Sequence, residues 1–313
     1  MQKKHVKAFA PATIANVACG FDVLGLAIDY PGDEIEISLN DTGIISIEKI
    51  EGDNGQLPRD INKNAASVVV RDYLQLIGEK VGASIAIYKK MPSGSGLGSS
   101  AASAVVAGFA INALFNFRLT KDELLPICIN GEEAACGARI ADNVSASLFG
   151  GITMVNSYTP LTVAKLPIPE NLFATVIHPH ITVLTKDARE ILPSSFPLKD
   201  IVKQQGAMAS FISGLYENNF EKIGFGLQDF LVEPFRKKLI PHFDLLKESA
   251  LANGALGCSI SGSGPSVFAL SNDENNAKKI ELGFRKIFEK ETISFETYLS
   301  KVNVEGPRII DLV

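Results

Sequence analysis

Apolar and polar residues alternate with a period of two in three short stretches of the first part of the chain. Such alternation is typical of strands with one buried face, and it predicts strands at 34–39, 45–47 and 83–88. Elsewhere in this half, apolar residues recur every three or four positions, which is the spacing of one helix face. That spacing predicts helices at 64–77, 101–117, 121–136 and 143–149. Unbroken apolar runs predict strands at 151–155 and 172–177.

The second half of the chain is predicted as helices separated by short strands. The helices are expected at 201–216, 220–231, 243–253 and 275–290, and the strands at 255–260, 266–270 and 295–304. Neighbouring strands with no helix between them favour an α+β fold over a regular βαβ array. Three of the fifteen prolines fall in 158–170, which predicts a domain junction near 157–171. Two domains are therefore expected, 1–160 and 161–313.

Composition then narrows the classes of function. The chain has 313 residues, of which 46% are hydrophobic and 21% charged, as in globular proteins rather than disordered tails or fibres. Its net charge of −5 provides no general basic field, so no nucleic-acid or membrane partner is expected. The four cysteines form no CxxC pair, which indicates reduced thiols in a cytoplasmic protein.

Residues 91–117 contain no charged side chain, and this length would suffice for a membrane helix. The first third of the segment is rich in Gly and Ser, however, and the rest is Ala-rich with Ser103, Gly108, Asn112 and Asn116 inserted. This composition favours a loop that leads into a buried helix of a soluble protein. The basic start of the chain is followed by no continuous apolar stretch, so no signal peptide is expected.

The most informative stretch is Pro-Ser-Gly-Ser-Gly-Leu-Gly-Ser-Ser-Ala-Ala at 92–102, between a predicted strand and a predicted helix. Gly94, Gly96 and Gly98 let the main chain approach a ligand closely. Ser99 and Ser100 fall where a helix has unpaired N–H groups and a partial positive charge. The stretch therefore predicts an anion pocket, with phosphate as the expected anion. The alternative is a glycine-rich turn that serves only tight packing.

Two better-known nucleotide-binding motifs do not fit this stretch. The Walker loop needs a lysine before its terminal hydroxyl, and none is present. The dinucleotide fingerprint needs a glycine where Ser99 stands, which disfavours a nicotinamide-dependent oxidoreductase. A second glycine-serine loop, 258–266, joins two predicted strands. Alone it would be an ordinary hairpin turn, but beside the first loop it is a candidate second wall of the same phosphate site.

The stretch 92–102 resembles the signature loop of the GHMP kinases, which phosphorylate small molecules with ATP. Four further segments, 11–27, 142–151, 233–241 and 259–266, resemble the homoserine kinase branch of that family and follow its order. The resemblance implies a two-domain α+β GHMP kinase fold. Its N-terminal mixed α/β domain (1–160) would carry the phosphate loop and bind ATP, and its C-terminal domain (161–313) would be ferredoxin-like α+β.

The resemblance also implies where ATP and Mg²⁺ bind. It places Asn64 beside the adenine and the phosphates against Pro92, Ser93, Gly94, Ser95, Gly96, Leu97, Gly98, Ser99, Ser100 and Ala101. For the metal it implies Ser100 and a glutamate of the next helix, where spacing favours Glu132 over Glu133. Adjacent helix residues point about 100° apart, so only one of the two faces the site. The alternative is that both are ordinary surface carboxylates.

The acceptor implied by the resemblance is an amino acid with a terminal hydroxyl, because Thr13 stands where sugar and isoprenoid kinases of the family usually carry lysine. A zwitterion needs a carboxylate for its ammonium group and arginine for its carboxylate. The residues that the resemblance assigns to the acceptor are Asn16, Asp22, Asn143, Arg189, Arg236, Gly262 and Gly264. Without the resemblance, Asp22 would be interpreted as a turn or cap residue and each arginine as a surface charge.

Asn143 stands where other kinases of the family carry an aspartate thought to deprotonate the acceptor hydroxyl, and an amide cannot take that proton. The expected mechanism is therefore alignment and charge stabilisation by Asn143, Thr185 and Arg189, without a dedicated base. The alternative for Thr185 is a hydroxyl at a strand end. Ile140 replaces a histidine that many homoserine kinases carry, which weakens the substrate assignment slightly.

Together these features predict ATP-dependent phosphorylation of the side-chain hydroxyl of L-homoserine, a step that the family connects to threonine biosynthesis. Two alternatives stay open: a GHMP kinase for another small alcohol, mevalonate- or sugar-like, and a non-catalytic ligand sensor with the same fold. His178 and His180 are interpreted as structural rather than as a zinc site. The sequence leaves the oligomeric state open, a homodimer included.

Overall fold

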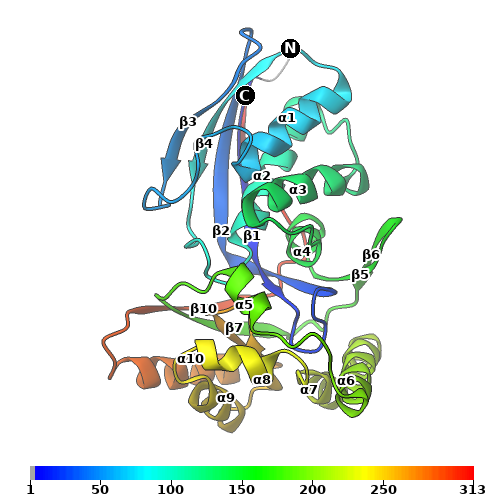
Figure 1. The fold of residues 1–313 in the computed structure, drawn as a ribbon, viewed down its shortest axis with the longest axis vertical. Helices are drawn as coiled ribbons and strands as arrows, with labels where there is room; N and C mark the ends of the chain where they lie inside the picture. The colour runs from blue at the N-terminus through cyan, green and yellow to red at the C-terminus, as the bar shows by residue number, and fades with distance from the viewer. Residues whose placement is uncertain (1–3) are drawn as a thin grey trace.

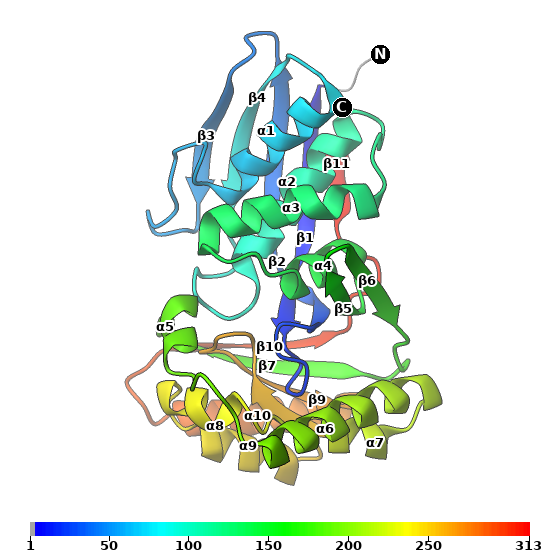
Figure 2. The same ribbon diagram turned by 45° about the vertical axis from the view of Figure 1, so that its right-hand side comes forward.

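The structure, a computed structural model, describes residues 4–313 and contains two β-sheets, each covered by helices (Figures 1 and 2). The first three residues of the basic start lie outside this range. In Figure 2 the first sheet and its helices form the upper part of the molecule, and the second sheet and its helices form the lower part. The mixed architecture agrees with the predicted α+β class.

The first sheet has seven strands: β1 (His5–Ala15), β2 (Leu24–Asn40), β3 (Ile45–Glu51), β4 (Gly82–Tyr88), β5 (Ile152–Tyr158), β6 (Leu161–Leu166) and β11 (Arg308–Leu312). Its order is β11-β1-β2-β4-β3, with β5 paired to β2 and β6 paired to β5. Neighbours are antiparallel except β3 and β4. The long strand β2 pairs with β5 near its start and with β4 near its end, so it joins the two parts of the sheet.

Four helices cover one face of this sheet: α1 (Ala65–Ile77), α2 (Ser99–Leu114), α3 (Lys121–Cys136) and α4 (Asp142–Phe149) (Figure 1). Helix α2 packs against β1 and β2 on one side and against α1 and α3 on the other. Fourteen of its 16 residues are buried, which explains its lack of a polar face. Within residues 4–313, no helix is long and apolar enough to cross a membrane.

The second sheet has four antiparallel strands: β7 (Phe173–Pro179), β8 (Gly257–Ile260), β9 (Val267–Ser271) and β10 (Phe295–Lys301). Its order, β10-β7-β9-β8, is the ferredoxin-like order that was predicted. The helices of this part are α6 (Leu198–Glu217), α7 (Phe220–Gly226), α8 (Glu233–Arg236), the 3₁₀ helix η1 (Lys237–Leu239), α9 (Phe243–Ala252) and α10 (Glu274–Phe288). They lie on the side of the sheet away from the first sheet (Figure 2).

One hydrophobic core contains residues of both sheets, among them Ile28, Val176 and Phe268. A smaller core lies between the second sheet, α9 and α10. The shared core fixes the two parts relative to each other, so a cleft between them is a built feature of the fold. Helix α5 (Thr185–Glu190) lies at the level of this junction (Figure 2).

Six elements were not predicted: β1, β6, β11, α5, α8 and η1. Strand β1 is buried along nearly all of its length and contains Pro11, so it shows no alternation. Strand β6 lies in the proline-rich segment, and β11 is mostly exposed. Helix α7 ends at Gly226, earlier than expected. The boundary at 160 stays a prediction, but β6 and β11 follow it in sequence and belong to the first sheet.

Candidate active site

A cavity of about 600 Å³ is lined by both glycine-serine loops and by the ends of α3, α4, α5 and α8. The predicted site residues that line it are Asn16, Asp22, Asn64, Ser93, Gly94, Ser95, Gly96, Gly98, Ser99, Ser100, Glu132, Asn143, Thr185, Arg189, Arg236 and Gly262. Four predicted residues do not line it: Pro92, Leu97, Ala101 and Gly264. Leu97 and Ala101 are core residues with fully buried side chains, so only their main-chain groups are candidates for ligand binding.

The first glycine-serine loop leads from β4 to the start of α2. Gly94, Gly96 and Gly98 have φ values of +70°, +79° and +65°, in the left-handed region that favours glycine. Gly98 is the N-cap of α2, and no described side chain caps this helix, so its first turn suits an anion. The Ser99 hydroxyl donates to the Met91 carbonyl at 3.1 Å, which ties the end of the loop to its beginning.

The second loop closes against the first. The Ser261 hydroxyl donates to the Gly96 carbonyl at 2.6 Å, and the Ser266 N–H donates to the Ser95 carbonyl at 3.3 Å. A Cβ at Gly96 would lie 2.5 Å from the Ser261 carbonyl oxygen and 2.8 Å from that of Gly264. The close approach of two main chains therefore requires glycine at 96. Gly264 contributes to this packing.

A buried ion pair that was not predicted supports the first loop. Lys89 Nζ contacts the Asp33 carboxylate and donates to the Ser99 carbonyl and the Ser103 hydroxyl, both at 2.8 Å. The other oxygen of Asp33 accepts from two main-chain N–H groups at the start of the loop, at 2.8 and 3.3 Å. The side chains of the pair are almost fully buried. The pair thus joins both ends of the phosphate loop.

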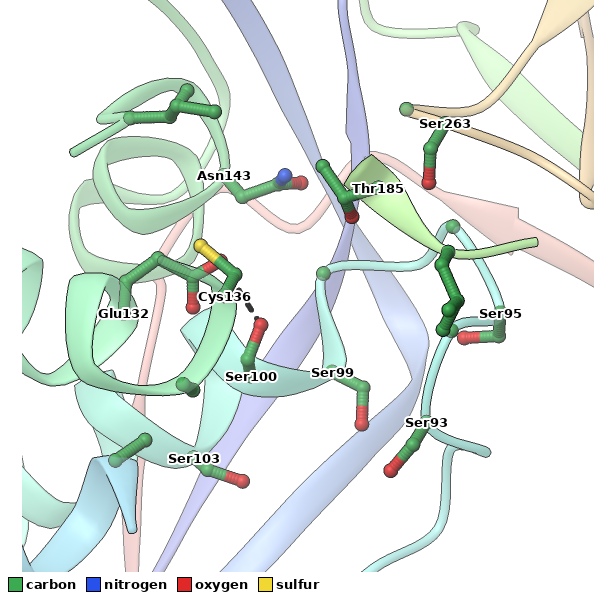
Figure 3. A pocket seen from close by; sticks show the side chains of 18 of the residues that line it. Ser93, Ser95, Ser99, Ser100, Ser103, Glu132, Cys136, Asn143, Thr185 and Ser263 are labelled. Atoms are coloured by element: carbon green, nitrogen blue, oxygen red, sulfur yellow. Dashed lines mark hydrogen bonds between the residues drawn. The ribbon is translucent and has the colours of Figure 1, made fainter. Parts of the chain in front are cut away.

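Glu132 lies at the end of the cavity where the metal was predicted. The Ser100 hydroxyl donates to Glu132 Oε1 at 2.9 Å (Figure 3), and the buried Oε2 has no partner among residues 4–313. Burial raises the pKa of this carboxyl group. Glu133 is exposed and instead pairs with Arg139 at 3.0 Å. A hydroxyl and a carboxylate with an unsatisfied oxygen are hard donors that fit Mg²⁺.

Water and nucleotide oxygens would complete the ligands of such an ion. Within the described part of the chain, no group of three or more His, Cys, Asp or Glu side chains is arranged to hold a metal. Mg²⁺ commonly keeps waters and phosphate oxygens as ligands and uses one or two protein groups, so Ser100 and Glu132 suit it when a nucleotide is bound.

The opposite end of the cavity carries charges of both signs. Arg189, on α5, donates from Nη2 to both carboxylate oxygens of Asp22 at 2.8 Å. Arg236, on α8, is buried and donates to the carbonyls of Ala188 and Gly262 at 2.8 and 3.0 Å. Burial and the neighbouring Arg189 lower the pKa of Arg236 to about 10, so it stays cationic at neutral pH.

Asn16 holds the segment 16–22 at this end. Its Oδ1 accepts from the Asp22 N–H, and its Nδ2 donates to the Gly262 carbonyl, both at 3.0 Å. Asn16, Val17, Ala18 and Asp22 all have positive φ values, between 43° and 69°. Such conformations cost about 1–3 kcal/mol each in residues other than glycine, and they concentrate at functional sites. Asn16 therefore fixes both Asp22 and the second loop.

Asn143 lies between the two ends of the cavity, and Thr185 also points into it (Figure 3). Asn143 Oδ1 accepts from the hydroxyl of the buried Thr13 at 2.6 Å, which leaves the amide NH₂ as its donor toward the cavity. The Thr13 N–H in turn donates to the Leu97 carbonyl at 3.0 Å. Thr13 was noted only as a departure from other kinases, but here it connects Asn143 to the phosphate loop.

Asp142 lines the cavity, although no role was predicted for it. Its carboxylate is buried and accepts from the N–H of Asn143 at 2.6 Å. Burial, followed by the nearby charge of Asp22, raises the pKa of Asp142 to about 7. It belongs to the segment 142–151 that resembles the homoserine kinases, so a signal for it was present in the sequence.

We expect Asp142→Asn to stabilise the protein more at pH 8 than at pH 5. The folded pKa of about 7 lies above the value of 3.8 for an unperturbed aspartate. Between these values the unfolded chain loses a proton that the native protein keeps, so stability falls as pH rises through this window. At pH 8 the buried charge costs up to about 4 kcal/mol, which the amide avoids. Thermal denaturation of both proteins across this range is the measurement, and a constant difference in Tm would contradict the expectation.

Three other predicted positions have local explanations. Asn64 caps α1: its side chain accepts from a main-chain N–H at 3.0 Å and donates to a carbonyl at 2.9 Å. It lines the cavity, and its contact with adenine stays a prediction. Ile140 also lines the cavity with its apolar side chain. His178 is buried against Ser266 at 3.2 Å, and burial lowers its pKa to about 4, so it is neutral at pH 7.

Comparison with known protein families identifies the class of protein to which this fold and site belong. A model described as the GHMP kinases N terminal domain matches residues 62–151, and one described as GHMP kinases C terminal matches residues 211–290. Together the two models match more than half of the chain, and the first match includes the phosphate loop and Asn143. The class is that of the two-domain GHMP kinases.

Individual relatives narrow this class. The homoserine kinase of Chlorobaculum tepidum is 42% identical and covers 98% of each chain, and that of Pyrococcus abyssi is 38% identical and covers 96% of this chain and 97% of its own. The crystal structure of homoserine kinase from Cytophaga hutchinsonii has a TM-score of 0.97 and 50% identity, over 99% of this chain and 98% of the other. The chain belongs to the homoserine kinases of the GHMP superfamily. L. major mevalonate kinase, with a TM-score of 0.74 and 16% identity over 96% of this chain and 97% of its own, shares the fold.

Proposed function

We propose that the protein transfers the γ-phosphoryl group of ATP to the side-chain hydroxyl of L-homoserine, giving O-phospho-L-homoserine. One observation carries the proposal: the cavity has an anion-binding glycine loop at one end and Asp22 with Arg189 and Arg236 at the other. A zwitterionic amino acid matches the second end, with its ammonium group on Asp22 and its carboxylate on the arginines. The names of the relatives support the same substrate.

In this proposal the phosphates of ATP lie along residues 94–101, where main-chain N–H groups and the start of α2 offset their charge. Ser100 and Glu132 would hold Mg²⁺. When bound, the ion neutralises charge on the phosphate oxygens and orients them. Asp33 and Lys89 keep the loop in shape, because the Lys89 ammonium is engaged by three acceptors inside the protein.

Asn143, Thr185 and Arg189 would align the acceptor hydroxyl with the γ-phosphorus. The Asn143 amide NH₂ donates a hydrogen bond to the negative charge that develops on the transferring phosphoryl group. The Thr13 hydroxyl donates to the Asn143 amide oxygen and so keeps the NH₂ group facing the cavity. The proton of the acceptor hydroxyl passes to a phosphoryl oxygen or to water. A loose phosphoryl-transfer transition state depends on such positioning more than on a strong base.

The test is a phosphorylation assay with Mg·ATP against homoserine, serine, galactose, mevalonate and shikimate. Turnover of homoserine far above the others is expected. Turnover of mevalonate or galactose alone would replace the proposal with a kinase for another small alcohol. Binding of homoserine without turnover of any acceptor would identify a ligand sensor.

For the metal site, we expect Ser100→Ala and Glu132→Gln each to lower kcat at least about tenfold and to raise the Mg²⁺ concentration needed for half-maximal rate. Ser100→Ala removes the hydroxyl donor, and Glu132→Gln replaces the carboxylate with a neutral amide, which is a weaker ligand for Mg²⁺. Glu133→Gln is the matched control, because it removes the neighbouring exposed carboxylate and should leave both values unchanged. Normal activity in both site variants would mean that the metal is held elsewhere.

We also keep the cytoplasmic location as part of the proposal. All four cysteines are free thiols in the structure, and Cys19, Cys128 and Cys258 are buried. Burial raises the pKa of each of these three thiols, so they are protonated and unreactive at neutral pH.

A further inference from the structure

The ring of Phe21 contacts both arginines of the acceptor end, which is the end of the cavity that carries Asp22, Arg189 and Arg236. Its ring centroid is 5.4 Å from the guanidinium carbon of Arg189 and 5.1 Å from that of Arg236. Phe21 immediately precedes Asp22 in the segment 16–22, whose left-handed backbone is held by Asn16. Phe21 is not itself a lining residue of the cavity, whereas both arginines are. Phe21 therefore acts on a ligand only through residues that line the cavity, and the arginines are the two whose side chains its ring contacts.

Two guanidinium groups near one ring repel each other, and the ring offsets part of this repulsion. The face of an aromatic ring carries negative charge density, which attracts a cation within about 6 Å. The mutual repulsion contributes to the lowered pKa of Arg236, after burial. A branched aliphatic side chain at this position would fill space but would give no such attraction.

The two arginines differ in the hydrogen bonds that fix their guanidinium groups. Arg236 is fixed by two main-chain carbonyls, of Ala188 and Gly262. Arg189 bonds only to Asp22 among the described residues, and its buried Nε has no partner. Besides that ion pair, the cation–π contact with the Phe21 ring restrains the Arg189 guanidinium.

This difference matters once an amino acid binds. In the proposed function the ammonium group of the acceptor competes with Arg189 for the Asp22 carboxylate. When Asp22 turns to the ammonium group, Arg189 loses its bidentate partner and must then meet the acceptor carboxylate. Without a second restraint its long side chain would be free to leave the cavity, and ordering it again would cost side-chain entropy.

We propose that Phe21 is a positioning residue for the acceptor carboxylate. Its ring holds the guanidinium groups of Arg189 and Arg236 side by side, and it keeps Arg189 in place when the ammonium group of the amino acid takes over Asp22. The inference rests on the proposed function, and it adds a residue through which the site selects acceptors that carry a carboxylate.

The test compares homoserine with 3-aminopropan-1-ol, which has the same hydroxyl and ammonium groups but no carboxylate. In Phe21→Leu the KM for homoserine is expected to rise roughly tenfold, because two cation–π contacts are lost. The KM for ATP and the inhibition constant of 3-aminopropan-1-ol against homoserine phosphorylation stay unchanged. Phe21→Tyr keeps the ring and restores the low KM for homoserine.

Phe9→Leu is the matched control, because it removes a ring that lies 3.9 Å from the Arg308 guanidinium, outside the cavity. It should leave unchanged both the KM for homoserine and the inhibition constant of 3-aminopropan-1-ol. Equal weakening of homoserine and 3-aminopropan-1-ol in Phe21→Leu would overturn the proposal, as would an unchanged KM for homoserine. If a lowered Tm shows that the leucine variant folds poorly, Phe21→Met provides the same comparison with a more adaptable side chain. A wild-type protein that does not phosphorylate homoserine would overturn the proposed function itself, a result distinct from either outcome.

Discussion

Gly98→Ala is expected to lower kcat at least about a hundredfold while the protein still folds. A Cβ at this position would collide with the Thr13 hydroxyl and lie 2.9 Å from Asn143 Oδ1. These two atoms form the 2.6 Å hydrogen bond that orients the Asn143 amide. The alanine would therefore displace the phosphate loop and Asn143 together, and the donors prepared for the transferring phosphoryl group would be lost.

The measurement is steady-state kinetics with homoserine and Mg·ATP, accompanied by thermal denaturation. Gly55→Ala is a matched control, since Gly55 has a φ of +73° but its Cβ would meet nothing within 4 Å. It imposes the same kind of backbone strain, about 1–3 kcal/mol, without the collision. A Gly98→Ala protein with wild-type kcat would show that the contact between loop and Asn143 is unimportant for transfer.

Arg236→Leu is expected to raise the KM for homoserine by roughly two orders of magnitude and to change the KM for ATP little. Arg236 is 3% exposed, so the substrate carboxylate that it would meet is largely desolvated as well. A buried carboxylate that loses one of its two arginines is left partly unpaired, which costs several kcal/mol. Arg236→Lys keeps the charge but loses the planar fork, and it should recover only part of the affinity.

Lys237→Leu is the control for this prediction. Lys237 is the next residue in the chain, and its ammonium group pairs with Asp244 on the surface at 2.9 Å. Its loss should leave both KM values unchanged. Equal increases in the KM for ATP and for homoserine after Arg236→Leu would contradict the assignment of Arg236 to the acceptor.

Elements with strong local patterns were predictable from the sequence. Helix α3 occupies 121–136 as expected, because Thr120 and Glu123 form a capping box at its start and Gly137 ends it. Strands β1 and β11 were not predictable in this way. They exist because β1 pairs with β2 on one side and with β11 on the other, and the pairing of β1 with β11 joins segments distant in sequence.

The candidate site shows the same division. Asp22 and Ser100 belong to segments with a recognisable pattern, whereas Glu132 and Arg189 lie outside them and were assigned through the resemblance. The structure brings all four to one cavity. The groups that hold them in place were missed. Lys89 and Asp33 are separated by 56 positions, and Thr13 and Asn143 by 130. Motifs indicate which side chains meet a ligand, but tertiary packing decides which side chains meet each other.

In the proposed function, the ion pair between Asp22 and Arg189 presents the same two charges as the amino acid that would bind there. A zwitterion would separate this pair and supply a new partner to each side chain, so every charge would remain paired. An alcohol with a single charge would leave either Asp22 or Arg189 without an ionic partner. An uncharged alcohol would leave the ion pair intact, so the two side chains would still fill the space that the amino acid needs. Discrimination against metabolites that carry a hydroxyl but only one ionic group therefore begins before any of them enters.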